Sequence, residues 1–204
     1  MRRRTTLALP LVLALAATAF AGPNDPELAI GTKGPGFELM GTDGKKHALP
    51  EFLSKTKATA VVFTCNTCPY SKAYEPVLLE IAAQYAKQPV SFVLINSNSA
   101  EVQPLDSFDE MVKIAKEKKY PFVYLHDETQ AIATAYGAQR TPHVFLLDAE
   151  GVCRYRGRID DNAKRDEVQT HDLTTAIDAL LAGKEITTAE TKAFGCTIKW
   201  RKAS

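Results

Sequence analysis

The sequence has 204 residues with 25 basic and 24 acidic side chains, so its formal net charge is +1. Without residues 1–21, which contain three arginines and no acidic residue, 22 basic side chains stand against 24 acidic ones. A chain without a cationic surplus lacks the electrostatic basis for binding nucleic acid or an anionic membrane. The remaining residues are enough for one domain with a substantial core, which we expect over 22–204, with a C-terminal tail from about residue 184.

Residues 1–21 have the pattern of a signal peptide. Three arginines at positions 2–4 precede an apolar run over 7–17, and Ala19-Phe20-Ala21 supplies a small-x-small cleavage site. The run is shorter than the roughly 20 apolar residues that span a bilayer. We therefore predict a secreted, most simply periplasmic, protein without stable membrane insertion after cleavage; a retained N-terminal anchor is the alternative.

The first half of the mature chain alternates strands and helices. The expected elements are a strand at 37–40, a return strand at 45–49, a short helix at 49–55, a strand at 58–64, a helix at 71–87 and a strand at 90–95. The segment 58–64 is continuously apolar and β-branched, which is typical of a strand that is buried on both faces. It therefore predicts the centre of a sheet covered by helices.

The second half continues the alternation and ends with an antiparallel pair. The expected elements are a helix at 107–119, a strand at 121–125, a helix at 129–136 that Gly137 ends, a hairpin of 144–147 and 152–156, and a helix at 171–181. This order predicts an α/β fold with a central mixed β-sheet flanked by helices. It resembles a thioredoxin fold with an N-terminal hairpin and one inserted strand–helix unit between 96 and 130.

The motif Cys65-Asn66-Thr67-Cys68 follows the buried strand and precedes a helix. The first-turn N–H groups and the helix dipole stabilise a thiolate at such a junction. We expect Cys65 to lie at the exposed lip and to be the more ionised thiol, and Cys68 to lie one turn inward. An inert disulfide or half of a zinc site are the alternatives, but a short loop stabilises little and no second Cys or His pair follows.

Thr141-Pro142-His143 precedes the strand expected at 144–147. A Thr-Pro at the entrance to a buried strand suits a cis-proline turn. Such a loop can offer its backbone to an incoming peptide or thiol beside the cysteines, so these three residues are candidate substrate-binding residues. His143 either faces the cysteines and favours their thiolates or is an ordinary rim histidine.

Several short motifs together resemble the redoxin group of alkyl-hydroperoxide-reductase/thiol-specific-antioxidant proteins and thioredoxin-like oxidoreductases, and within it a peroxiredoxin-like subgroup with a CxxC pair. They are residues 31–37, 65–70, 95–98, 136–138, 155–161 and 195–200. The resemblance covers nearly the whole mature chain. It implies a thioredoxin fold and redox-active cysteines.

The resemblance assigns two roles to the pair. Cys68 occupies the position of the peroxidatic cysteine of peroxiredoxins, while Cys65 and Cys68 together match the thioredoxin pair. Against the peroxiredoxin pattern, Val61 and Cys65 replace a proline and a threonine, and Pro142 falls where the activating arginine is expected.

A further departure concerns the proton acceptor of the inner thiol. Thr59 stands where thioredoxins carry a buried acid, six residues before the first cysteine. Glu75, on the helix that follows the pair, is a weak candidate for this role.

Two isolated cysteines, Cys153 and Cys196, leave two interpretations open. A bridge between them would close a loop long enough to stabilise the chain by a few kcal/mol in the entropy model. Cys196 could instead be a resolving thiol that reaches the cysteine pair.

Taken together, the sequence predicts an exported thiol–disulfide oxidoreductase that works through Cys65 and Cys68. Its partners would be protein thiols or disulfides and a protein that recycles the pair, and no metal or organic cofactor is required. One alternative is a thiol peroxidase that uses Cys68. Another is a copper-binding assembly chaperone in which the paired thiolates, with His143 nearby, hold Cu(I).

Overall fold

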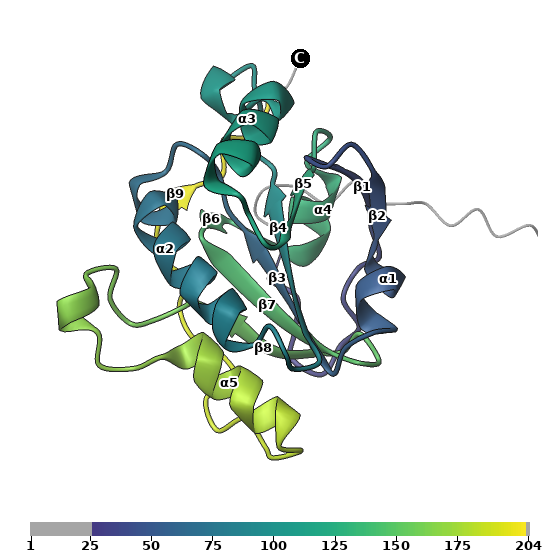
Figure 1. Ribbon diagram of the computed structural model, residues 1–204, viewed down its shortest axis with the longest axis vertical. Helices are drawn as coiled ribbons and strands as arrows, with labels where there is room; N and C mark the ends of the chain where they lie inside the picture. Colours follow the sequence, from purple (N-terminus) through teal and green to yellow (C-terminus); the bar gives the residue numbers. More distant parts are fainter. Residues whose placement is uncertain (1–25, 203–204) are drawn as a thin grey trace, which may run out of the picture.

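The computed structural model describes residues 26–202, so the predicted signal peptide lies outside the described part of the chain. Seven strands form one mixed sheet in the order β2-β1-β5-β4-β3-β7-β8 (Figure 1). They are β1 (Glu38–Gly41), β2 (Lys46–Ala48), β3 (Ala58–Phe63), β4 (Val90–Asn96), β5 (Val123–His126), β7 (His143–Asp148) and β8 (Cys153–Gly157). The predicted α/β class, the mixed sheet and the N-terminal hairpin β1–β2 are confirmed.

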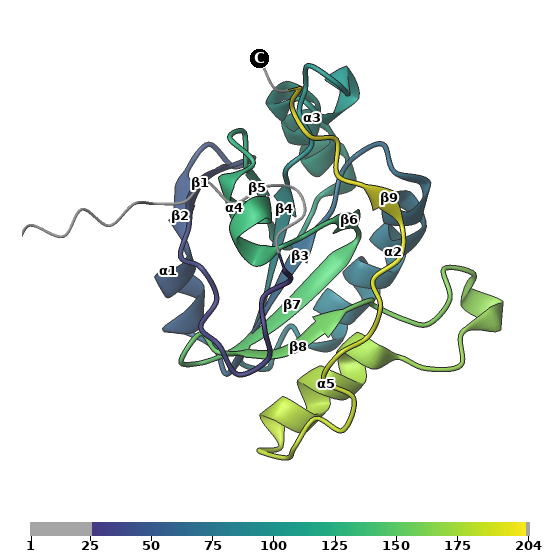
Figure 2. The same cartoon turned by 180° about the vertical axis from the view of Figure 1, so that it is seen from behind.

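Within residues 26–202, five α-helices accompany this sheet. They are α1 (Leu49–Leu53), α2 (Pro69–Gln84), α3 (Phe108–Lys118), α4 (Ala131–Tyr136) and α5 (Asp172–Leu181), with short 3-10 turns at η1 (Pro104–Asp106) and η2 (Arg165–Glu167). In the views of Figures 1 and 2, α2 and α5 lie on one side of the sheet and α4 on the other. No helix within residues 26–202 is long and apolar enough to cross a membrane.

Strand β3 is the structural centre, as the sequence predicts. It runs parallel to β4 and antiparallel to β7, and all six of its residues are buried. Because successive side chains of a strand point to opposite faces, β3 contributes to two cores. Ala60 and Val62 pack in the core on the side of α2 and α5, whereas Val61 and Phe63 pack in the core on the side of α4. This rigid strand leads directly into the Cys65–Cys68 segment.

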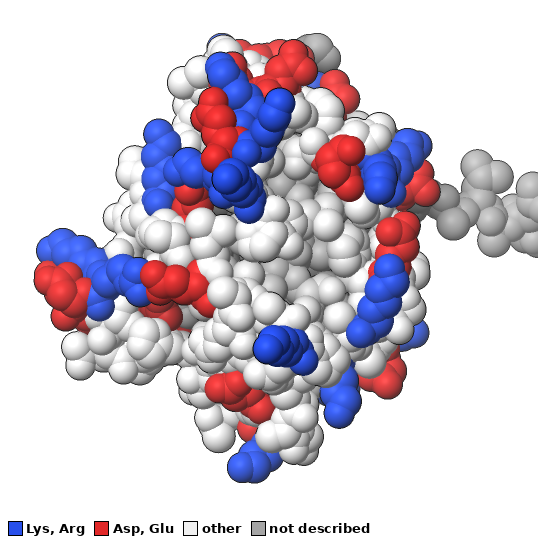
Figure 3. Space-filling model, viewed as in Figure 1, with Lys and Arg blue, Asp and Glu red and all other residues white. Residues whose placement is uncertain are grey.

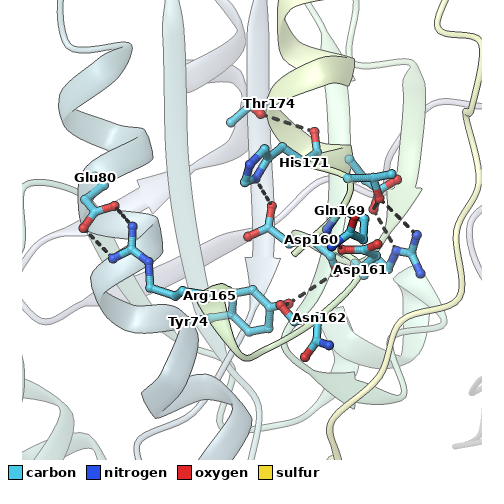
Figure 4. A network of polar contacts seen from close by, with 12 residues as sticks. Tyr74, Glu80, Asp160, Asp161, Asn162, Arg165, Gln169, His171 and Thr174 are labelled. Carbon is cyan, nitrogen blue, oxygen red and sulfur yellow. Dashed lines mark hydrogen bonds and ion pairs between the residues drawn. The ribbon is translucent and has the colours of Figure 1, made fainter. Parts of the chain in front are cut away.

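A hydrogen bond and an ion pair join the loop over 158–171 to α2 (Figure 4). The Tyr74 hydroxyl donates to the carbonyl oxygen of Asn162 at 3.0 Å, and Arg165 forms a two-pronged ion pair with Glu80. These contacts hold the entry to α5 against the helix whose N-cap residue is Cys68.

Local signals predict the ends of several elements well. Gly137 adopts the left-handed conformation (φ 63°) and ends α4, as expected. Helix α2 begins two residues before the predicted start, because Pro69 occupies a first-turn position where its missing N–H costs nothing. The tail contains a strand that the sequence did not predict: β9 (Cys196–Thr197) pairs with β6 (Arg140–Thr141) in a second, two-stranded sheet.

Candidate functional site

The two cysteines of the motif lie at the junction of β3 and α2. Cys68 is the N-cap residue of α2, with extended backbone angles (φ −64°, ψ 125°), and Pro69 follows in the first turn. Both side chains are buried, with exposed fractions of 6% for Cys65 and 3% for Cys68. The expectation that Cys65 lies at an exposed lip is therefore wrong, because Thr141 covers this end of the helix.

Thr141 contacts both sulfur atoms. Its hydroxyl oxygen lies 3.5 Å from the Sγ of Cys65, and its carbonyl oxygen accepts a hydrogen bond of 3.1 Å from the Sγ of Cys68. The Thr141–Pro142 peptide bond is cis, as predicted. The cysteine motif and the proline loop, more than seventy residues apart in sequence, thus meet at one point.

The two thiols have opposite electrostatic environments. Hydrogen bonding by the Cys65 thiol lowers the pKa of Cys68, and the Cys196 side chain and the Ser71 backbone N–H act in the same direction. The same shared proton raises the pKa of Cys65, together with burial and the nearby negative charge of Asp106. The Thr141 carbonyl oxygen opposes a thiolate on Cys68, whereas the Thr141 side chain adds to the groups that lower its pKa. These opposite pKa shifts favour Cys68, not Cys65 as expected, as the more ionised thiol.

Asp106 holds the dipeptide between the cysteines. This fully buried carboxylate accepts hydrogen bonds from the Asn66 backbone N–H at 2.6 Å and from the Thr67 hydroxyl at 2.7 Å. The Asn98 side chain donates to it at 2.8 Å, and Tyr124 donates to the Asn66 side chain at 2.9 Å. Asp106 is a site residue that sequence reasoning missed. Its only signal in the sequence is its place in the polar run that follows β4.

A cavity of about 220 Å³ opens beside Cys65, between α2 and α3. Ser71 contributes a buried hydroxyl that has no hydrogen-bond partner within the described residues. Glu75, the candidate proton acceptor, also lines the cavity, but its carboxylate binds Lys118 at 2.6 Å and Tyr120 at 3.0 Å. Glu75 therefore faces the same space as Cys65 while being held by other partners.

Two sequence departures have clear structural correlates. Thr59 is fully buried on β3, and its hydroxyl lies 3.1 Å from that of Thr56, so this position supplies no carboxylate below the cysteines. Pro142 is the cis-proline, so the position where the resemblance expects an arginine carries no charge.

His143 lies away from the cysteines. It is completely buried, its ring packs 4.5 Å from that of Phe145, and its Nε2 lies 3.9 Å from the Glu27 carboxylate. Burial lowers the pKa of His143 to about 3, and both ring nitrogens lack hydrogen-bond partners in the described chain. Neither expectation, a histidine facing the cysteines or one at the rim, holds. Within residues 26–202, no group of three or more His, Cys, Asp or Glu residues is arranged to hold a metal ion.

The structure separates the two isolated cysteines. Cys153 is buried on β8 opposite Leu147, whereas Cys196 lies on β9 opposite Thr141. Leu147 and Thr141 are six positions apart along an extended segment, on the order of 20 Å, whereas a disulfide needs Cα atoms within about 7 Å. This arrangement argues against a Cys153–Cys196 bridge. It brings Cys196 to Thr141 instead, whose carbonyl oxygen accepts the hydrogen bond of the Cys68 thiol. Burial and the neighbouring Cys68 raise the pKa of Cys196.

Comparison with known proteins agrees with this architecture. The chain is 24% identical to the thiol-disulfide oxidoreductase ResA of Geobacillus thermodenitrificans, over 82% of this chain and 91% of that protein. A crystal structure of an uncharacterised conserved protein from Geobacillus kaustophilus matches with 38% identity and a TM-score of 0.81, over 87% of this chain and 95% of that one. A solution structure assigned to a thioredoxin of Neisseria meningitidis matches with a TM-score of 0.59 at 20% identity, over 74% and 91% of the two chains.

The last of these confirms the thioredoxin-like fold that the order of elements predicts. The family model Redoxin matches residues 29–177, which include the whole seven-stranded sheet and the cysteine motif. The chain belongs to the Redoxin family.

Proposed function

We propose that this protein is an exported thiol–disulfide oxidoreductase that exchanges disulfides with protein partners through Cys65 and Cys68. The observation that carries the proposal is that the sulfur atoms of both cysteines contact the same residue, Thr141, at the start of α2. Two thiols one helical turn apart can close a disulfide reversibly, and their shared proton keeps one of them ionised. The name of the relative ResA describes the same reaction class.

The cavity beside Cys65 supports a division of labour between the thiols. Cys65 lines this cavity, whereas Cys68 lies beneath Thr141 and the tail. In the proposed reaction the Cys65 sulfur attacks a client disulfide, its proton passes to the Cys68 thiolate, and the first client sulfur leaves as a thiolate. Cys68 then attacks the Cys65 sulfur of the mixed disulfide, and its proton passes to the second client sulfur. Two electrons move to the client, and the protein keeps a Cys65–Cys68 disulfide; the reverse sequence oxidises a client.

Exposed apolar side chains beside the pair favour a polypeptide as the client. Tyr70, in the first turn of α2, is 42% exposed, and Leu105 is 60% exposed. Leu105 lies next to the motif, because its carbonyl oxygen accepts a hydrogen bond of 2.9 Å from the Asn66 side chain. In the view of Figure 3, charged side chains gather at the top of the molecule, around α3, and a largely uncharged surface extends across the middle. A second protein would recycle the pair, and the basic and apolar start of the sequence supports export.

The test is exchange with a disulfide-bonded reporter such as insulin. The wild type and the control Cys153→Ser should reduce it with a chemical reductant as the electron source, because Cys153 is buried elsewhere. Cys65→Ser and Cys68→Ser should each lose the activity. Full turnover by Cys65→Ser or by Cys68→Ser, or no turnover by the wild type, would contradict the proposal.

A thiol peroxidase is the second candidate, and the environment of Cys68 favours it. Cys68 is the N-cap residue of α2, and hydrogen bonding from Cys65, Cys196 and the Ser71 backbone lowers its pKa, which favours a peroxide-reactive thiolate. Peroxide consumption by the reduced protein that is lost in Cys68→Ser but retained in Cys65→Ser would establish this activity. The copper alternative loses its histidine ligand, because His143 is buried next to Phe145.

A further inference from the structure

The C-terminal tail runs past β6 and α2 as β9 and is anchored on both sides of this crossing (Figure 2). Before the crossing, the ring of Phe194 packs against Tyr70 at 5.9 Å and Tyr74 at 6.2 Å, both on α2. After it, Ile198 is buried in the core on the α4 side of the sheet, and its N–H donates to the carbonyl oxygen of Gln139 at 3.1 Å. The short segment between these anchors carries Cys196.

Strand pairing places this segment directly on the loop that contacts both thiols. Cys196 is the register partner of Thr141, and Thr197 that of Arg140. Gly195 permits the close approach, because a Cβ atom there would overlap the Thr141 carbonyl oxygen, and its φ of +143° is rare for other residues. The Arg140 side chain closes the contact by donating to the Gly195 carbonyl oxygen at 3.2 Å.

This pairing occupies the backbone edge of Arg140 and Thr141, where the cis-proline loop was expected to offer its backbone to an incoming client. The tail adds its own strand there, in the manner of a bound peptide, and brings Cys196 to the register position opposite Thr141. Two thiols accordingly lower the pKa of Cys68: Cys65 within its own motif and Cys196 from the tail.

We propose that Cys196 is a third redox thiol, which forms an intramolecular disulfide with Cys68 in exchange for the Cys65–Cys68 disulfide. The inference rests on the proposed function, because it takes the Cys65–Cys68 disulfide as its starting point. Its physical basis is the strand pairing of Cys196 with Thr141, the residue whose carbonyl oxygen accepts the hydrogen bond of the Cys68 thiol.

The exchange needs no outside oxidant or reductant. The Cys196 sulfur attacks the Sγ of Cys68, the Cys65–Cys68 bond breaks, and Cys65 leaves with the electron pair of that bond. The proton of Cys196 passes to Cys65, so one disulfide and one thiol are present before and after. The oxidised equivalent is thereby stored between α2 and the tail, and Cys65 is again free to react at its cavity.

The charges around Cys196 are consistent with this step. Burial raises its pKa, and so does the neighbouring Cys68, whereas the cationic side chains of Lys199 and Arg140 lower it. Once Cys68 is part of a disulfide, it carries no negative charge. Cys196 then keeps two favourable cations and loses a repulsive neighbour, so it ionises most readily when Cys68 is oxidised.

Disulfide mapping in Cys65→Ser tests the proposal. After mild oxidation with diamide and alkylation of the remaining thiols, we expect a Cys68–Cys196 disulfide within a monomer, with free Cys196 reduced by about tenfold or more. Cys65→Ser/Cys153→Ser should behave identically, whereas Cys65→Ser/Cys196→Ser should form no intramolecular disulfide. In the unmodified chain the same mapping should recover both Cys65–Cys68 and Cys68–Cys196.

An oxidised Cys65→Ser protein in which Cys196 stays fully alkylatable, with Cys68 in intermolecular dimers, would overturn the proposal. Absence of Cys68–Cys196 from the unmodified protein would do the same without relying on a variant. Insulin reduction by the wild type distinguishes a failure of the proposed role of Cys196 from a failure of the proposed function. If it persists while no Cys68–Cys196 bond forms, only the role of Cys196 is wrong; if the Cys65–Cys68 pair itself never exchanges, the proposed function has failed.

Discussion

The Sγ of Cys68 lies 3.1 Å from the carbonyl oxygen of Thr141, and Thr141 is also the strand-pairing partner of Cys196. One residue of the cis-proline loop therefore joins the helix that carries the cysteine motif to the tail that carries the third thiol. Changes to the chemistry of Cys68 and changes to the seating of the tail are consequently expected to affect each other.

The ionisation of Cys68 should depend on Cys65. In the reduced wild type, thiolate absorbance should develop below the ordinary thiol pKa of about 8.5. A hydrogen bond to a charged group contributes about 1.5–3 kcal/mol, so Cys65→Ala should raise the midpoint by about 1–2 pH units. Cys153→Ala is the control and should leave it unchanged. An unshifted midpoint in Cys65→Ala would show that Cys65 does not lower the pKa of Cys68.

Asp106 should stabilise the fold through the turn between the cysteines. Asp106→Asn keeps the shape of the side chain but places an amide donor among donors, so at least one buried group loses its partner. The expected loss is about 1–3 kcal/mol in the free energy of unfolding, measured with denaturant. Asp109→Asn, at an exposed position on α3, should change it little. Equal effects of the two substitutions would contradict the role given to Asp106.

The close approach of the tail should depend on Gly195. Gly195→Ala should force the tail away from Thr141, so Cys196 should be alkylated faster and Cys68–Cys196 should form less. Gly183→Ala is a matched control, since Gly183 also has a positive φ but its Cβ would meet open space. Both substitutions strain the backbone by about 1–3 kcal/mol, yet only the first should expose Cys196. Protection of Cys196 that survives Gly195→Ala would refute this part of the account.

His143 should make the folded state sensitive to acid. Burial lowers its pKa to about 3, whereas the unfolded chain protonates near 6.5, so the unfolded state binds the extra proton first. The folded state is therefore fully favoured above about pH 6.5 and loses up to about 1.4 kcal/mol per pH unit as the pH falls toward 3. Denaturant unfolding of wild type and His143→Leu at several pH values measures this difference. Identical pH dependence in the two proteins would contradict it.

Local sequence signals were sufficient for the parts of the fold that local physics determines. The apolar run 58–64 predicts the buried strand β3, Gly137 predicts the end of α4, and Thr141-Pro142 predicts the cis turn. The site could be placed at the junction of β3 and α2 for the same reason. Each of these features depends on residues that are close together in the sequence.

The remaining features depend on distant contacts and were not predictable in this way. Asp106 reaches Asn66 across 40 positions, and β9 is too short to show strand periodicity. The burial of Cys65 and the direction of proton sharing follow from Thr141 and Asp106, which the motif itself does not contain. The prediction that His143 faces the cysteines or the rim is wrong, because alternation along β7 directs its side chain into the core beside Phe145.

The most direct test of the central claim is a redox titration of the Cys65–Cys68 pair. The reduced protein is equilibrated in dithiothreitol or glutathione buffers of known potential, quenched with acid and alkylated, and the disulfides are mapped by mass spectrometry. The account predicts a reversible two-electron transition in which Cys65–Cys68 forms and disappears with the buffer potential, and which Cys153→Ser does not change. A Cys65 that never enters a reversible disulfide with Cys68, or a Cys68 that oxidises only with peroxide, would contradict it.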